Sequence, residues 1–187
     1  MSTGEDRLFA ALTSSLGQPP WAVYRNVAWL EKRPGSEPAD GEADIVVAHP
    51  DLGVMVVEVK GGRVQRIGGR WESLDAAGNR HDIKNPFAQV TREMHGLKRK
   101  CQDLPAWPSG NVRFARAVCL PDSAYDRSMT PDGPREMVID HDDLADAGAR
   151  VKAIFDWWSA SGDASTAGGA PGAIGMAALH ELSGATW

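Results

Sequence analysis

The chain has 187 residues, a length that suits one domain with a short tail. Hydrophobic residues make up 42% and charged residues 24%, close to the averages for soluble globular proteins, which excludes collagen-like, coiled-coil and fully disordered chains. The formal net charge is -5. This value excludes a protein that coats nucleic acid by bulk charge, although a local basic patch is compatible with it.

The two cysteines, Cys101 and Cys119, are too few for a disulfide framework or a cysteine-based structural zinc site. Their apolar neighbours favour buried free thiols. The N-terminal segment carries Glu5 and Asp6 where a signal peptide has basic residues, and no apolar run approaches the ~20 residues that span a bilayer. We therefore expect a soluble protein of the reduced cytoplasm with no membrane partner.

Charge is distributed unevenly along the chain. Residues 60–100 contain ten Lys and Arg residues and four acids, a net charge of +6 by subtraction, so the rest of the chain carries -11. A basic segment inside an acidic chain indicates either a contact surface for a polyanion or the ordinary solvated surface of a helix and a hairpin.

The hydrophobic pattern predicts helices and strands in a mixed order. A helix should run from Thr3 to about Ser15, with Asp6 completing a capping box. After a polar loop over 31–41 we expect a hairpin, because Pro50, Asp51 and Gly53 are strong turn residues. The four apolar residues 54–57 predict a strand buried on both faces. The first three strands are expected over residues 22–30, 43–48 and 53–60.

The second half of the chain is expected to begin with a short hairpin over 64–73. Asn85 then caps a helix that has Pro86 at its first position and runs to about Gln102. From Ser161 the composition shifts to Ser, Gly, Ala and Pro, which predicts a domain over 1–160 and a linker or tail over 161–187. The remaining elements are strands over 112–120 and 137–140, helical pieces over 142–147 and 149–160, and a weak helix over 173–182.

Acidic residues lie at the ends of two neighbouring predicted strands. Asp44 opens one predicted strand, and Glu58 and Lys60 close the next, two residues apart, so that their side chains project to the same face. The hairpin makes the two strands neighbours. An antiparallel pairing places Asp44 beside Glu58, although the register does not follow from the sequence.

Two neighbouring carboxylates beside an apolar strand repel each other and are costly to bury. A divalent cation relieves both costs, and hard Mg²⁺ prefers oxygen ligands and keeps several waters. Asp44, Glu58 and the backbone carbonyl of Val59 form a suitable ligand set. A metal held there activates water and neutralises charge on a phosphodiester, and Lys60 adds a positive charge near the attacking water or the scissile phosphate.

The acid-x-lysine triplet is a weak signal by itself, because a second one occurs at Asp82-Ile83-Lys84. Only the first ends a buried apolar strand that follows an acid-bearing strand. The alternative for Glu58 and Lys60 is a structural ion pair at the end of a strand.

Three segments resemble the nuclease-related domain family, a branch of the PD-(D/E)XK nuclease superfamily: residues 41–47 (GEADIVV), 53–62 (GVMVVEVKGG) and 85–89 (NPFAQ). The resemblance covers about residues 4–120, in matching order and spacing. It implies a three-layer α/β/α core like that of restriction endonucleases, with a central mixed sheet. It also implies DNA cleavage that depends on Mg²⁺ (or Mn²⁺), with Asp44, Glu58 and Lys60 as the catalytic set.

The resemblance extends to two further side chains. Gln89 matches a glutamine that faces the active site in RecB-like relatives, and Glu5 matches the acid of their first helix. Glu5 then helps to hold metal or to orient Lys60. The alternatives are a solvated flank residue for Gln89 and an acid that complements the helix dipole for Glu5. Glu93 departs from the pattern, since those relatives have an aromatic residue there.

The basic segment supplies the expected contacts to the DNA backbone, namely Arg63, Arg66, Lys98, Arg99 and Lys100. The alternative function is a non-catalytic nucleic-acid-binding or accessory module that keeps the fold. A further possibility is a domain of a larger helicase- or kinase-like assembly, or a homodimer. The sequence itself contains no motor motif.

Overall fold

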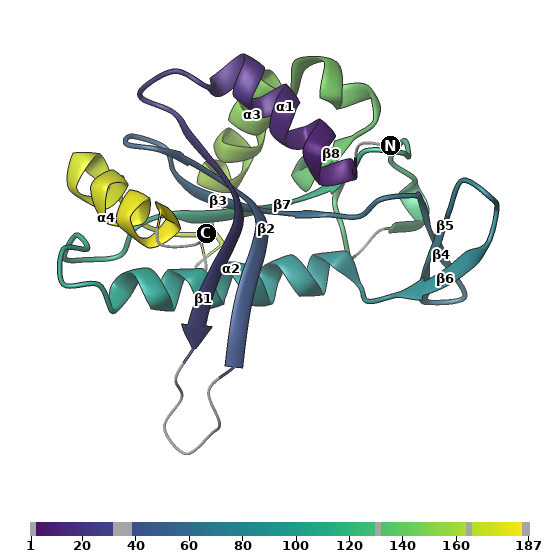
Figure 1. Ribbon diagram of the computed structural model, residues 1–187, viewed down its shortest axis with the longest axis horizontal. Coiled ribbons are helices and arrows are strands. Elements are labelled where there is room, and N and C mark those ends of the chain that lie inside the picture. Colours follow the sequence, from purple (N-terminus) through teal and green to yellow (C-terminus); the bar gives the residue numbers. More distant parts are fainter. Residues whose placement is uncertain (1–2, 32–38, 130–131, 164–165, 185–187) are drawn as a thin grey trace.

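A five-stranded mixed sheet forms the centre of the molecule (Figure 1). The computed structural model describes residues 3–31, 39–129, 132–163 and 166–184. The strand order is β1-β2-β3-β7-β8. The first three strands pair antiparallel, and β7 and β8 continue the sheet in parallel with β3. The strands are β1 (Ala22–Glu31), β2 (Ala39–His49), β3 (Gly53–Val59), β7 (Phe114–Leu120) and β8 (Val138–Asp140).

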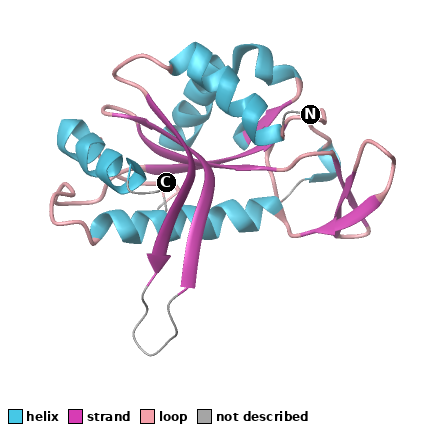
Figure 2. Cartoon of the chain, in the orientation of Figure 1, coloured by secondary structure: helices cyan, strands magenta, loops and turns pink. Residues whose placement is uncertain are grey.

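Helices cover both faces of this sheet. Helix α2 (Pro86–Gln102) packs along one face, mainly on β3 and β7. Helices α1 (Gly4–Leu16) and α3 (Ala147–Ala160) pack on each other and on the opposite face (Figure 2). This arrangement confirms the predicted three-layer α/β/α fold with a mixed central sheet.

The central strand and its covering helix show why these layers form. All seven residues of β3 are buried, as expected for a strand with apolar side chains on both faces. On α2, the apolar residues recur at helical spacing and form the buried stripe that faces the sheet. The side-chain oxygen of Asn85 accepts hydrogen bonds from the Phe87 and Ala88 backbone N–H groups, so the predicted cap is confirmed. The stripe consists of Phe87, Val90, Met94, Leu97 and Cys101.

The first helix also begins as predicted. The hydroxyl of Thr3 accepts from the Asp6 N–H at 3.2 Å, and the Asp6 carboxylate accepts from the Thr3 N–H at 3.0 Å. This capping box fixes the start of α1 at the edge of the sheet. Leu8, Leu12 and Leu16 form the buried stripe that holds the helix on the core.

The polar loop expected over 31–41 is wrong at its two ends, and its middle part, 32–38, lies outside the described residues. β1 runs to Glu31 and β2 begins at Ala39, so the two strands form a long two-stranded arm that projects beyond the rest of the sheet (Figure 1). We call residues 27–31 and 39–43 the β1–β2 arm. Its ladder was missed because Asp40, Gly41 and Glu42 have low strand propensity, and cross-strand pairing with β1 overrides that propensity.

A separate three-stranded sheet follows the central strand: β4 (Arg63–Ile67), β5 (Arg70–Leu74) and β6 (Arg80–Ile83). The β4–β5 hairpin confirms the prediction, whereas β6 had no apolar alternation to reveal it. A carboxylate-centred turn brings β6 back beside β5. Asp75 Oδ1 accepts hydrogen bonds from the Ala77 and Asn79 N–H groups, both at 2.9 Å.

The C-terminal third closes the fold. Three short 3₁₀ helices, η1 (Arg127–Met129), η2 (Arg135–Met137) and η3 (Asp142–Asp146), precede α3. Helix α4 (Gly172–Gly184) then packs on β1 and β2 and buries Ala178 and Leu179. The expected helix within the segment 161–187 is therefore present, and the domain boundary at residue 160 stays a prediction. Within the described ranges, no helix combines the length and the apolar character that crossing a membrane requires.

We predict that neither cysteine of the native protein reacts with a thiol reagent. Cys101 and Cys119 are free and fully buried, and burial raises the pKa of the Cys101 thiol to about 12, so the reactive thiolate is scarce at neutral pH. A colorimetric disulfide reagent should detect no thiol before denaturation and both thiols in guanidinium chloride. Rapid labelling of the folded protein would contradict this packing.

Candidate active site

The candidate site lies at a fork where β2 separates from β3. The β2–β3 ladder ends with the pair Ile45 and Val57, and β2 continues beyond that point with β1 alone. One step further in the same register, Asp44 lies beside Glu58. Asp44 Oδ2 accepts a hydrogen bond of 2.8 Å from the Val59 N–H. The side chain of Asp44 thus caps the central strand at the place where the neighbouring strand leaves.

Glu58 and Lys60 project to the same side of β3 and form an ion pair, with 2.5 Å between Glu58 Oε1 and Lys60 Nζ. The Glu58 side chain is 2% exposed and that of Lys60 is 22% exposed. The pair therefore joins a buried carboxylate to an ammonium group that reaches the surface. The backbone of Lys60 is held by β7, because its N–H donates a hydrogen bond of 2.9 Å to the Cys119 carbonyl.

The environment of Glu58 opposes its negative charge. Burial first, and then the negative charges of Asp44 and Glu93, raise the pKa of its carboxyl to about 8 against the opposing effect of Lys60. One lysine therefore does not compensate the carboxylates gathered here. An additional positive charge at the site would stabilise the ionised form of these carboxylates.

Helix α2 contributes Gln89 and a third carboxylate, Glu93. Gln89 Nε2 donates to Glu93 Oε1 at 3.0 Å, and burial raises the pKa of the Glu93 carboxyl. Among the described residues, no partner accepts or donates a hydrogen bond at Glu93 Oε2, which is buried. The sequence predicted Gln89 here but treated Glu93 only as a departure from the family pattern. The signal was their spacing of four residues, which places both on one flank of the helix.

Glu5 lies at the rim of the site. Burial raises the pKa of its carboxyl, and the negative charge of Asp44 is the next largest cause. The start of α1 comes close to the end of β3 because residue 4 is glycine. A Cβ at Gly4 would lie 2.7 Å from the Pro121 ring and 3.4 Å from Val59 Cγ1.

The donor chemistry of the fork fits a hard divalent cation. Asp44 and Glu58 offer carboxylate oxygens, the Val59 carbonyl is the third group that the sequence suggests, and Glu93 adds a buried oxygen without a partner in the described structure. No three His, Cys, Asp or Glu side chains of the described residues are arranged as a complete metal cage. A cation held by two carboxylates would accordingly keep several water ligands, as Mg²⁺ does in proteins.

A cleft of about 690 Å³ opens beside these carboxylates, between the β1–β2 arm and α2. Gln89 and Glu93 belong to its wall, so the cleft adjoins the fork through these two side chains. We call it the arm cleft. It is lined by Trp29, Asp40, Gly41, Glu42, Lys84, Gln89, Arg92, Glu93, His95, Gly96 and Arg99.

The five predicted DNA contacts are spread over the molecule. Only Arg99 lines the arm cleft. The Lys98 ammonium lies 6.0 Å from the centre of the Phe114 ring, and the Arg66 guanidinium pairs with Asp132 at 3.4 Å. Lys100, near the end of α2, is half-buried.

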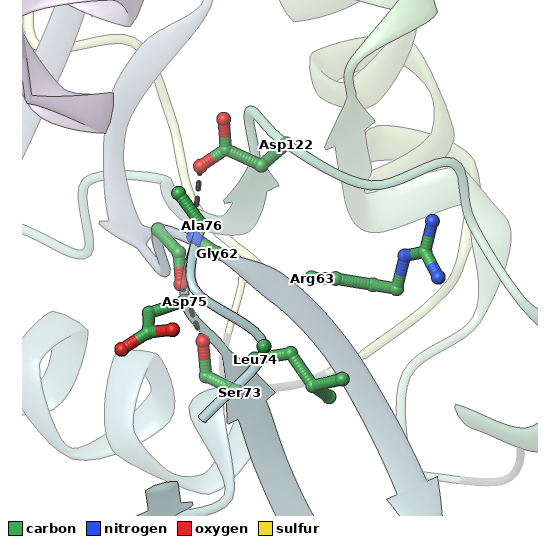
Figure 3. A pocket seen from close by; sticks show the side chains of 9 residues that line it. Gly62, Arg63, Ser73, Leu74, Asp75, Ala76 and Asp122 are labelled. Carbon is green, nitrogen blue, oxygen red and sulfur yellow. Dashed lines mark hydrogen bonds between the residues drawn. The ribbon is translucent and has the colours of Figure 1, made fainter. Parts of the chain in front are cut away.

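Arg63 and Arg66 lie three apart on β4 and therefore face opposite sides of the small sheet. Arg63 lines a second hollow of about 620 Å³ that begins directly after Lys60, with Asp75 and Asp122 also in its wall. In Figure 3 the Arg63 guanidinium points away from both carboxylates. Asp122 Oδ2 accepts from the Gly62 N–H at 2.7 Å, which fixes the chain just beyond the ion pair.

A sequence model of the nuclease-related domain matches residues 2–121, about two thirds of the chain. The match includes Glu5, Asp44, Glu58, Lys60 and Gln89. No curated protein and no solved structure matches the chain significantly.

We predict that Glu58→Gln makes the metal-free protein less sensitive to rising pH. A carboxyl whose folded-state pKa is raised from 4.5 to about 8 contributes stability below pH 4.5 that is lost as the pH rises through 8. The loss can reach about 1.4 kcal/mol per pH unit in the free energy of unfolding. In urea unfolding measured in EDTA, the free energy of unfolding of the variant should therefore rise relative to that of the wild type between pH 4.5 and 8.

The matched control for this measurement is Glu181→Gln, which removes an exposed carboxylate from α4. It should follow the wild-type curve at every pH. Parallel curves for the wild type and Glu58→Gln would show that the Glu58 carboxyl is not perturbed by its surroundings.

Proposed function

Because the chain belongs to the nuclease-related domain family, we propose that it is a metal-dependent nuclease that hydrolyses phosphodiester bonds of DNA, in processing, repair or defence. One observation carries the proposal. Asp44, Glu58 and Lys60 meet at the end of the central strand, with Gln89 and Glu93 beside them on α2. The reduced cytoplasm is the proposed location, which fits the two free thiols.

In this proposal, Mg²⁺ or Mn²⁺ is held by the carboxylates of Asp44 and Glu58 and by the Val59 carbonyl. When bound, such an ion lowers the pKa of a coordinated water and neutralises charge on the phosphate. The hydrogen bond from the Val59 N–H turns Asp44 toward the end of β3. The buried position of Glu58 keeps its carboxylate out of competing contacts with solvent.

Lys60 has the role of a positive charge beside the scissile phosphate or the attacking water. Its ion pair with Glu58 holds the ammonium group at the edge of the site, where it is partly exposed and can meet substrate. At 4 Å and an effective dielectric of about 20, the attraction between an ammonium and a phosphate oxygen is about 4 kcal/mol before desolvation. Gln89 orients Glu93 through its hydrogen bond, and Glu5 adds charge at the rim.

The alternative, a binding or accessory module without catalysis, predicts a different response to the same variants. Such a module would bind DNA in a salt-sensitive manner, unaffected by divalent metal and by Lys60→Ala. The gathered carboxylates favour the enzyme, because burial and mutual repulsion make them costly without a cation.

We predict that the wild type nicks supercoiled plasmid in the presence of Mg²⁺ or Mn²⁺, and that Lys60→Ala and Asp44→Ala lower the rate by about a hundredfold or more, as for loss of one electrostatic group in an active site. The assay is gel electrophoresis over time. Arg70→Ala, at the exposed start of β5, is the control and should retain full activity. Equal nicking by all variants would reject the catalytic assignment.

A second prediction concerns metal binding without any substrate. Mg²⁺ at a hundred times its dissociation constant should stabilise the wild type by about 2.7 kcal/mol, which raises the melting temperature by about 5–10 °C for a chain of this size. Asp44→Asn should abolish the shift, because it removes one charged ligand. Asp51→Asn, in the exposed β2–β3 turn, should keep it. A shift that survives Asp44→Asn would place the cation elsewhere.

A further inference from the structure

We propose that the arm cleft binds the backbone of a single nucleic-acid strand and leads it to the carboxylates of the fork, with the Trp29 indole N–H as a hydrogen-bond donor to the strand. The inference rests on the proposed function, since the bound strand is the substrate of that site. Figure 1 shows the β1–β2 arm crossing α2. Contacts between the arm and α2 confirm that the two elements lie side by side there.

The position of the cleft connects it to the chemistry. Glu93 and Gln89 form one end of its wall, and Glu93 is also among the charges that act on Glu58. A chain that follows the cleft as far as Glu93 therefore comes next to Glu58. The cleft lies on the α2 side of the sheet, whereas the hollow lined by Arg63 begins on the far side of Lys60.

Trp29 carries the evidence for a ligand. Its side chain is 6% exposed and lines the cleft, and its buried indole N–H has no hydrogen-bond partner in the part of the chain that the structure describes. A buried donor without an acceptor is costly and calls for an explanation, such as an acceptor supplied by a bound molecule. Tryptophan can only donate, so the missing partner is an acceptor such as a phosphate oxygen.

Two glycines fix where this donor lies. A Cβ at Gly41 would come within 2.3 Å of Trp29 Nε1, and a Cβ at Gly96 within 3.3 Å of the same atom. The indole therefore lies directly on the backbone of β2 and close to that of α2. Its nitrogen therefore lies at the contact between the arm and the helix, the two elements that line the cleft.

The charges of the cleft are divided between its two walls. The wall on α2 and just before it carries three cations, against the one carboxylate of Glu93, and the wall on the arm carries two acids. The cations are Lys84, Arg92 and Arg99, and the acids are Asp40 and Glu42. A phosphodiester backbone is attracted to the first wall and repelled by the second. The strand would therefore run with its phosphates along α2 and with its bases toward the arm.

The size of the cleft suits a short stretch of a single strand. A volume of about 690 Å³ lies within the range of sites that enclose a ligand of drug size, about 300–1,000 Å³. This is room for a short stretch of one strand. A duplex would bring twice as many nucleotides into the same length of cleft.

The test measures binding without cleavage. Fluorescence anisotropy with a short fluorescein-labelled oligothymidylate, in EDTA, compares the wild type with Trp29→Phe, Arg92→Gln and Lys152→Gln. Lys152 is exposed on α3, across the sheet from the cleft, and removing it matches the loss of one charge. The same oligonucleotide annealed to its complement is the duplex probe.

We expect the wild type to bind the single strand more tightly than the duplex. Trp29→Phe keeps most of the packing and loses the donor, so it should weaken binding about tenfold, as for a hydrogen bond to a charged group. Arg92→Gln should reduce the slope of log K against log salt by about 0.7, the value for one phosphate contact on a single strand. Lys152→Gln should change neither quantity. Arg92, which is exposed on α2, carries the test by itself if Trp29→Phe proves unstable.

Two results would overturn the inference: equal affinity for the duplex and the single strand, or wild-type binding by Trp29→Phe and Arg92→Gln. Either result, together with plasmid nicking that depends on Lys60, refutes the cleft and leaves the proposed function intact. Single-strand binding with the expected variant effects but no metal-dependent nicking supports the cleft and refutes the nuclease.

Discussion

A single hydrogen bond, from the Val59 N–H to Asp44 Oδ2, gives a partner to a backbone donor that the sheet itself leaves unpaired. The N–H groups of Val54 and Lys60 point toward β7 and bond there. By the alternation of a strand, the Val59 N–H points toward β2, which has already left to pair with β1 alone. Without Asp44 this donor would lose its partner at the end of the most buried strand. The carboxylate that supplies the partner is therefore also the one that stands beside Glu58.

The divergence of the strands explains the other features of the site. It frees the β2-facing edge at one end of β3, while the other edge stays paired with β7, and Glu93 of α2 lies close enough for its charge to act on Glu58. It also opens the space between the arm and α2 that Trp29 partly fills. A sheet with β2 and β3 paired along their whole length would have neither the gathered carboxylates nor the arm cleft.

Sequence patterns were sufficient to predict those elements whose structure is determined by residues close together in the chain. The periodicity of α2, the apolar run of β3 and the capping residues Thr3 and Asn85 each predicted an element that the structure confirms. The neighbourhood of Asp44 and Glu58 followed from the hairpin, once an antiparallel register was assumed. These features depend on contacts between residues that are close in sequence or joined by a tight turn.

The features that escaped prediction depend on contacts across the fold. Strand β6 and the outer part of β2 are polar, so only pairing reveals them. The position of Glu93 beside Glu58 depends on which strand α2 covers. The close packing of the Trp29 indole depends on two glycines in different elements, Gly41 and Gly96. The basic segment is a single feature in the sequence, but a strand and a helix distribute its side chains over several surfaces.

The C-terminal third packs on the core, so the folded unit extends beyond the residues that match the family. The match to the family ends at residue 121, yet β8 pairs with β7 beyond that point, and α3 buries Val151, Ile154 and Phe155 against the rest of the core. A recombinant fragment cut at the limit of the match would keep α1 but lose α3 and β8, so the part of the sheet that α3 covers and the edge of β7 would be exposed to water. Expression and domain-grafting experiments should therefore set their boundary by the helices that cover the sheet, not by the extent of the shared motifs.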